Sequence, residues 1–239
     1  MEPIQNSSIE IRQDNTLEDP ELEQGELFSV KFLAATPDAE KLILYAARVS
    51  SDNRNSENTK LLGYLIRNQH WSPLEIPSLS IEITAARAII RQILRHRSFT
   101  FQEYSQRYAA VKESALIVNE ARRQDLKNRQ SSIDDIPADV KKEWIDKQKS
   151  LNRKIYETYK WALSKNIAKE CARVIMPEGN TISTLCMSGT LRSWVHYLSL
   201  RSSNGTQLEH RQIALACLEI FKEQFPIIYD AAFKDLNLI

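Results

Sequence analysis

The chain has 239 residues, of which 42% are hydrophobic and 26% charged, so it is long enough to bury a sizeable core and has the balance of an ordinary globular protein. Its 32 basic and 31 acidic side chains give a net charge of +1, which excludes the broad basic field that nucleic-acid binding by counterion release requires. We therefore expect no nucleic-acid partner, and any anion site must be local.

Signals for a membrane or for secretion are not evident. The N-terminus lacks a basic stretch followed by an apolar one, and no run approaches the roughly 18 apolar residues that span a bilayer. We therefore expect no membrane partner and a cytoplasmic protein, in the host cytoplasm if the source is a virus. Cys171, Cys186 and Cys217 form no CxxC pair, so we predict neither a disulfide framework nor a metal site.

Glycine is scarce. The chain has five glycines, whereas the usual frequency of about 7% would give roughly seventeen. Neither a GxGxxG motif nor a P-loop is present. If the protein binds a nucleotide, arginine guanidinium groups must hold the phosphates in place of a glycine-rich backbone cradle.

The N-terminal part divides into an arm and the start of a folded domain. Residues 1–26 are acidic with a single base, which predicts an extended arm. Residues 27–239 show no repeat and no break in composition, so we expect one domain there. The run LFSVKFLAAT from Leu27 predicts a strand, and residues 42–50 and 59–69 predict two short helices.

A second strand and a third helix follow. Leu79, Ile81 and Ile83 alternate with polar residues, which is the period of a strand with one buried face. Residues 86–94 then place apolar side chains at helical spacing, and this helix leads directly into the Arg-His-Arg sequence at 95–97.

The C-terminal half is predicted to be helical. Residues 112–140 are polar and typical of an insertion or a mobile surface loop. A long helix is expected from about 138 to 176, ended by Pro177. Two more helices are expected at about 189–203 and 206–224.

The corner between the last two helices carries two terminal signals. Asn204-Gly205 matches a C-cap, and Thr206 with Glu209 matches a capping box. Together these elements predict an α+β fold, a small antiparallel-type sheet packed with several helices in a single domain.

The densest polar and aromatic cluster is the segment RHRSFTFQEYSQRY at 95–108. A solvated basic edge would explain its composition. An RNA-binding role is another interpretation, since arginine and aromatic side chains can clamp phosphates and stack on bases. The near-neutral total charge weakens that second interpretation.

The spacing within this segment is more specific than its composition. Arg-His-Arg is followed after seven residues by Ser105, with Glu103 two positions before that serine and Arg107 two positions after it. The pattern resembles the signature of the flavin-dependent thymidylate synthases. Further blocks agree in order and spacing, namely AARVS, HWSPLE, ECARVIMP and LRSWVHYLSLRSSNGTQLEHRQIA, so the resemblance covers most of residues 42–225.

The resemblance implies an enzyme that reductively methylates dUMP to dTMP. In this family 5,10-methylenetetrahydrofolate donates the one-carbon unit and NADPH reduces the FAD cofactor. It also implies a homotetramer with active sites at subunit interfaces. Two alternatives stay open, an inactive homologue and a nucleic-acid-binding module.

Matching positions carry the family's binding residues onto this chain. The residues matched to flavin binding are Ser72, Arg95, His96, Arg97, Glu103, Thr190, Leu191, Arg192 and His196. The residues matched to dUMP binding are Gln92, Arg95, Glu103, Tyr104, Ser105, Gln106, Arg107, Arg173 and Arg201. Gln102, His196 and Gly205 depart from the family's usual Asn, Asn and His.

Arg201 is the predicted catalytic residue. It continues the apolar stripe of Trp194, Val195 and Leu198, so its side chain is expected to point inward, where a guanidinium needs an anionic or polar partner. The resemblance implies that it binds the uracil ring and favours ionisation at N3; a structural salt bridge is the alternative. None of the three cysteines lies in a polar cluster, so no cysteine nucleophile is expected.

Overall fold

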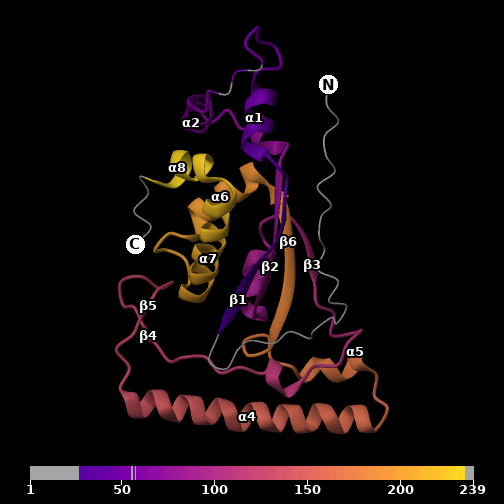
Figure 1. Ribbon diagram of the computed structural model, residues 1–239. Helices are drawn as coiled ribbons and strands as arrows, with labels where there is room; N and C mark the ends of the chain where they lie inside the picture. Colours follow the sequence, from indigo (N-terminus) through magenta and orange to yellow (C-terminus); the bar gives the residue numbers. More distant parts are fainter. Residues whose placement is uncertain (1–26, 55, 57, 235–239) are drawn as a thin grey trace.

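The computed structural model describes residues 27–234 except residues 55 and 57. The arm predicted at residues 1–26 lies outside the described residues. Figure 1 shows a central sheet with helices packed against it and a long helix, α4, that runs across below the ends of the strands. Within the described part of the chain, no helix is long and apolar enough to cross a membrane.

A four-stranded antiparallel sheet forms the centre, with the order β1-β2-β6-β3. Its strands are β1 (Phe28–Ala35), β2 (Ser78–Ala86), β6 (Ile182–Thr190) and β3 (Thr100–Glu103). The predicted strands β1 and β2 and the small antiparallel sheet are confirmed. Strands β6 and β3 were not predicted, although β6 pairs with a neighbour on each side.

Strand β6 follows the alternation expected of a strand. Leu185 and Met187 are fully buried, whereas Cys186 and Ser188 on the other face are half-buried. The helix predicted from residue 189 begins at Leu191 instead, because residues before it pair with β2 up to Thr190. The alternation of buried and half-buried residues was present in the sequence, but the many Ser and Thr residues made it harder to recognise.

Helices and short elements complete the fold. The helices are α1 (Ala39–Ala47), α2 (Lys60–Arg67), α3 (Arg87–Ile93), α4 (Ala138–Ser164), α5 (Lys169–Ala172), α6 (Leu191–Arg201), α7 (Leu208–Gln224) and α8 (Pro226–Phe233). The 3₁₀ turns are η1 (Ser72–Glu75), η2 (Glu113–Ala115) and η3 (Arg173–Ile175), and a hairpin joins β4 (Arg123–Gln124) to β5 (Ser132–Ile133).

Helices α6 and α7 lie against one face of the sheet (Figure 1). Trp194 and Tyr197 of α6 are fully buried, and the Trp194 indole Nε1 donates to the Leu79 carbonyl at 2.9 Å. Phe99 packs edge-on against Trp194, with ring centroids 5.0 Å apart. Burying each aromatic side chain contributes about 2–3 kcal/mol. These rings fix the position of α6 on the sheet.

The long helix predicted to reach residue 176 is shorter, since α4 ends at Ser164. Asn166 adopts the left-handed conformation with φ 60°, and the Ile167 N–H donates back to the Ala162 carbonyl at 3.0 Å. Asparagine tolerates this conformation and commonly follows a helix end. The stop therefore comes from Asn166, well before Pro177.

The predicted caps at the α6–α7 corner are wrong in detail. Helix α6 ends at Arg201 with Ser202 as its C-cap, and Gly205 is not in the left-handed region. Gln207, not Thr206, is the N-cap of α7, without a side-chain cap hydrogen bond. Glu209 instead binds the Arg122 guanidinium, a charge-assisted bond that is stronger than a bond to a neutral backbone N–H.

The polar segment at 112–140, expected as an insertion or mobile loop, is tied to two helices. Asn119 exchanges two hydrogen bonds with Gln148 of α4, at 2.9 and 2.8 Å. Arg122 reaches Glu209 of α7. Backbone and ion-pair contacts thus hold the first part of this segment against the domain.

We predict that Gly189→Ala destabilises the fold. A Cβ at this position would lie 2.5 Å from Cδ1 of Phe99, so the ring that packs on Trp194 would have to move. The free energy of unfolding should fall by about 1–3 kcal/mol. Urea denaturation measures the loss, and Gly205→Ala is the control because nothing lies within 4 Å of its added Cβ. Equal stability of the two variants would contradict this packing constraint.

Candidate functional site

An ion network anchors the strand that carries Glu103. Arg87 Nη1 lies 3.0 Å from Glu103 Oε1, and Arg91 Nη1 lies 3.3 Å from Glu103 Oε2. Both arginines also bind Glu178, and the Ser183 hydroxyl donates to Glu103 Oε1 at 3.1 Å. Burial raises the pKa of Glu178, but the hydrogen bonds and charges of Arg87 and Arg91 outweigh it and lower that pKa. Glu103 is thus already engaged by protein groups on both oxygens.

The turn after Glu103 carries the other residues of the signature. The Tyr104 N–H donates to the Thr184 carbonyl at 2.8 Å, which extends the sheet by one bond. Ser105 and Arg107 are exposed, whereas the Gln106 side chain is buried. Of the predicted dUMP contacts on this turn, Ser105 and Arg107 present side chains and Gln106 can offer only its backbone.

Arg107 connects the signature to the segment that carries Arg173. Its guanidinium lies 3.3 Å from Glu170 of α5. Arg173 follows in η3 and is half-buried. Two of the predicted substrate arginines, far apart in sequence, therefore lie on the same side of the domain.

The predicted catalytic residue, Arg201, meets the predicted flavin contact, His96. Arg201 is half-buried, and its Nε–H donates to His96 Nε2 at 2.9 Å. The inward direction expected for Arg201 is confirmed, and its partner is a neutral ring; within the part of the chain that the structure describes, it makes no ion pair. Burial, and then the charges of Arg201 and His196, lower the pKa of His96 to about 4.

The tautomer of His96 follows from this bond. Arginine remains protonated at any physiological pH and only donates. Nε2 of His96 must therefore accept, and its proton sits on Nδ1. The terminal N–H groups of Arg201 make no hydrogen bond to other described residues, so they stay available to a ligand.

Arg95 and Arg97 flank His96. Both side chains are exposed, and neither forms an ion pair or hydrogen bond with the residues resolved in the structure. Two exposed guanidinium groups next to His96 in the sequence offer donors of the kind that phosphate accepts from.

A second group of predicted flavin contacts gathers around Glu75. Thr190 Oγ1 donates to Glu75 Oε2 at 2.8 Å, and Arg192 Nη1 donates to Glu75 Oε1 at 2.5 Å. The hydrogen bond from Arg192 is the largest cause of the lowered pKa of Glu75, followed by the hydrogen bond from Thr190. Ser72 is exposed on the same 3₁₀ turn as Glu75. Sequence analysis did not assign Glu75 a role, yet it joins η1 to α6.

Two other matched positions differ in what they can contact. His196 is exposed one turn after Arg192. The Leu191 side chain is fully buried, and its N–H donates to the Pro77 carbonyl at 3.0 Å. Leu191 can therefore reach a ligand only through its carbonyl oxygen.

His210 was missed by sequence reasoning. It is fully buried, its Nδ1 lies 3.2 Å from Oε1 of the predicted substrate contact Gln92, and its Nε2 lies 3.2 Å from the Tyr197 hydroxyl. Burial, and then the charges of Arg201 and His96, lower its pKa to about 3. Its position at helical spacing with buried Ile213 and Ala214 was the available signal.

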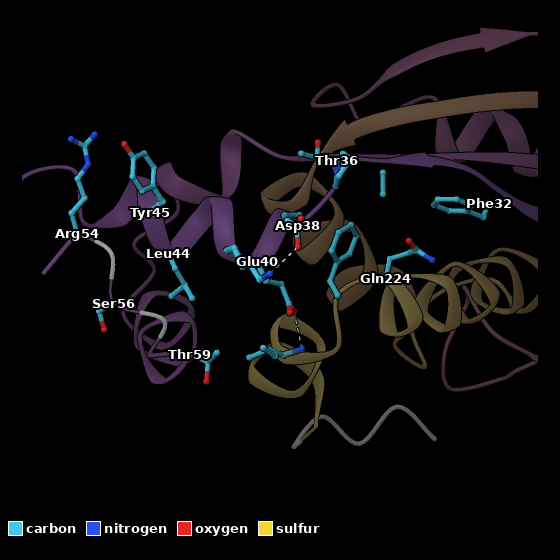
Figure 2. A pocket seen from close by; sticks show the side chains of 16 residues that line it. Phe32, Thr36, Asp38, Glu40, Leu44, Tyr45, Arg54, Ser56, Thr59 and Gln224 are labelled. Carbon is cyan, nitrogen blue, oxygen red and sulfur yellow. Dashed lines mark hydrogen bonds and ion pairs between the residues drawn. The ribbon is translucent and has the colours of Figure 1, made fainter. Parts of the chain in front are cut away.

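A cavity of about 730 Å³ lies elsewhere, between the end of β1, α1 and α8 (Figure 2). Its lining includes Glu40, whose carboxylate accepts from the Ile227 and Ile228 N–H groups at 2.8 and 2.9 Å and so satisfies the start of α8. None of the matched flavin or dUMP residues lines this cavity.

Most of the chain is similar in sequence to known proteins. Residues 31–227 match the family model described as thymidylate synthase complementing protein. A protein of Paramecium bursaria Chlorella virus 1, named probable flavin-dependent thymidylate synthase, is 50% identical over 196 residues, covering 81% of this chain and 90% of that protein. A flavin-dependent thymidylate synthase of Synechocystis is 51% identical over 190 residues, covering 79% of this chain and 87% of that protein.

Solved structures show the same fold. Crystal structures of the UMP/dUMP methylase PolB from Streptomyces cacaoi, bound with 5-Br UMP and with 5-Br dUMP, have TM-scores of 0.78 and 0.77 to this chain. Sequence identity is 25% and 24%, and each comparison covers 89% of this chain and 96% of the methylase.

We predict that stability falls at mildly acidic pH because two histidines are neutral in the folded protein. An unfolded histidine gains its proton near pH 6.5, whereas His96 and His210 gain theirs near pH 4 and pH 3. Between these values the unfolded chain binds more protons, so lowering the pH favours unfolding. The urea concentration at the midpoint of unfolding should decrease from pH 7 to pH 5, and this decrease should be larger for the wild type than for His210→Asn. Equal losses in the two proteins would argue against a neutral, buried His210.

Proposed function

The chain belongs to the flavin-dependent thymidylate synthase family, and from this premise we propose that it reductively methylates dUMP to dTMP. The proposed one-carbon donor is 5,10-methylenetetrahydrofolate, and the proposed reductant of its FAD is NADPH. The observation that carries the proposal is the bond between Arg201 and His96, since it joins the matched uracil-binding arginine to the Arg-His-Arg segment.

Arg201 has the chemistry that the proposed reaction needs at the pyrimidine. Its Nε is held by His96, so the plane of the guanidinium is fixed while its terminal N–H groups are free to bind the uracil edge. A fixed positive charge beside the ring favours the ionised form at N3, which raises electron density at C5. The half-buried position strengthens that charge relative to one in bulk water.

The donor set fits a phosphate-bearing flavin. Exposed, unpaired Arg95 and Arg97 would hold the pyrophosphate, and Nδ1–H of His96 would donate to a flavin edge. Ser72 and Arg192, which Glu75 brings together, would complete the flavin contacts. When bound, FAD supplies the hydride that reduces the transferred carbon.

The remaining matched residues would bind the nucleotide. Ser105 and Arg107 on the turn after β3 would contact the dUMP phosphate together with Arg173. The Tyr104 and Gln106 positions would contribute through the same turn. Glu103, held by Arg87 and Arg91, would orient this turn rather than act as a free carboxylate.

A cysteine nucleophile is not needed in this scheme, and the thiols support its absence. Burial is the main cause that raises the pKa of Cys217, and burial followed by the charge of Glu82 raises that of Cys186. Cys171 is exposed on α5. Thiols with raised pKa values remain protonated and are weak nucleophiles. Three free thiols also agree with the reducing cytoplasm, the location that we propose, in a host cell if the source is a virus.

We further propose a homotetramer with active sites at the subunit junctions, as the resemblance implies. Large apolar side chains on the surface of one chain support it, namely Phe32, Leu33, Tyr45, Tyr64 and Ile76, each 45% or more exposed. An active monomer in sedimentation analysis would contradict this arrangement.

Absorption spectroscopy tests the proposed function directly. The purified protein should show a flavin spectrum, and anaerobic NADPH should bleach it faster in the presence of dUMP. A colourless protein that neither takes up FAD nor oxidises NADPH would overturn the proposal in favour of an inactive homologue. Salt-dependent RNA binding without flavin would point to a nucleic-acid-binding module.

Arg201→Ala should separate turnover from flavin binding. Because this side chain would act on the pyrimidine, kcat for dTMP formation should fall about a hundredfold or more, while flavin content should change less than about twofold. Flavin content is read from the absorption spectrum and turnover from dTMP formation. Arg123→Ala, in the exposed hairpin, is the control and should match the wild type. Equal loss of flavin and turnover in Arg201→Ala would contradict the role assigned to Arg201.

A further inference from the structure

A chain of hydrogen bonds runs from the surface of α7 to the core behind the Arg201–His96 pair. Its links join Arg122 to Glu209, Glu209 to Gln207 at 2.9 Å, Gln207 to Gln92 at 2.7 Å, Gln92 to His210 at 3.2 Å, and His210 to Tyr197 at 3.2 Å. Tyr197 in turn packs edge-on against the His96 ring, with centroids 4.9 Å apart. The chain thus connects the matched substrate contact Gln92 to the matched flavin contact His96.

The carboxylate of Glu209 sets the direction of every bond in this chain. Burial raises the pKa of Glu209, but hydrogen bonds from Arg122, its own backbone and Gln207 outweigh burial and lower it, so the group is ionised at neutral pH. An ionised carboxylate only accepts. The NH₂ end of Gln207 must therefore face Glu209, which leaves its carbonyl oxygen to accept from Gln92 Nε2.

The same reasoning determines the tautomer of His210. Since Gln92 turns its NH₂ end to Gln207, its carbonyl oxygen faces His210, whose Nδ1 must donate. Nε2 of His210 is then unprotonated and accepts from the Tyr197 hydroxyl. The low pKa of His210, about 3, agrees with a neutral ring that carries one proton.

The consequence for Gln92 is a fixed amide. One of its two N–H groups donates to Gln207; the other makes no hydrogen bond to the residues that the structure describes, and the side chain is half-buried. Without a partner at both ends, the amide could flip and turn its carbonyl oxygen toward a ligand. With its carbonyl held by His210, Gln92 presents only an N–H donor, which suits an anionic or carbonyl oxygen.

We propose that His210 is a positioning residue for nucleotide binding: its Nδ1–H, acting together with the Gln207 carbonyl oxygen, holds the Gln92 amide so that an N–H group faces bound dUMP. The identity of the ligand rests on the proposed function. Both ring nitrogens of His210 have partners, and these bonds offset the cost of burying a polar ring among Ile213 and Ala214 on α7.

Substitutions at position 210 test this role. His210→Asn keeps an N–H near the place of Nδ1, His210→Gln keeps an acceptor near the place of Nε2, and His210→Leu keeps neither. The holoenzyme of each variant is titrated with dUMP to obtain Kd, and kcat and KM for dUMP are measured. Loss of one hydrogen bond should weaken dUMP binding by roughly five- to tenfold in His210→Leu and His210→Gln, with kcat nearly unchanged. His210→Asn should restore most of the affinity.

A second background decides whether His210 acts through Gln92. In Gln92→Ala, adding His210→Leu should change Kd for dUMP by less than about twofold, because the amide to be locked is gone. Ile213→Val is the matched control for disturbing the same buried face of α7, and its Kd should equal that of the wild type. If His210→Leu does not fold, His210→Gln replaces it in both backgrounds and gives the same decision.

Several outcomes would overturn the inference. Equal affinity in wild type and His210→Gln would do so, as would an equal loss from His210→Leu with and without Gln92. A wild type that binds no dUMP would overturn the proposed function together with this inference. A wild type that binds dUMP, with variants that bind it equally well, would overturn this inference alone.

Discussion

Pairing of β6 with a strand on each side is the constraint on which the rest of the structure depends. Its register with β2 sets Ile182 opposite Ala86 and Thr190 opposite Ser78. Because β2 leads directly into α3 and β6 leads directly into α6, this one pairing places both helices. The β3 register then brings the signature turn back along the same strand. Side chains more than a hundred residues apart, such as His96 and Arg201, meet as a result.

Electrostatics in the site follow from burial as much as from charge. Arginines surround the centre, and the two histidines between them are neutral because desolvation and the neighbouring guanidinium groups both oppose protonation. Neutral imidazoles can accept from Arg201 and from Tyr197, which imidazolium ions could not. The positive charge therefore stays on the arginine side chains, where it can meet phosphate and a pyrimidine anion.

Carboxylates organise the periphery. Glu103, Glu75 and Glu209 each bind an arginine and at least one neutral donor, so each joins two elements of the fold rather than facing solvent alone. Family matching predicts ligand binding for Glu103, and its ion pairs with Arg87 and Arg91 show that it also links α3 to β3. Family matching alone could not reveal these ion pairs, because a motif records which residue is present and not which neighbours it has.

Local periodicity and motif spacing were sufficient to predict the family, the α+β class, the presence of strands β1 and β2, and the inward direction of Arg201. The strand order and the partner of each site residue depend on the tertiary fold, because they involve segments far apart in the sequence. A short strand such as β3, four residues long, is specified by its pairing with a distant segment rather than by its own pattern. Glu75 and His210 likewise make contacts across more than a hundred residues, which no local pattern encodes.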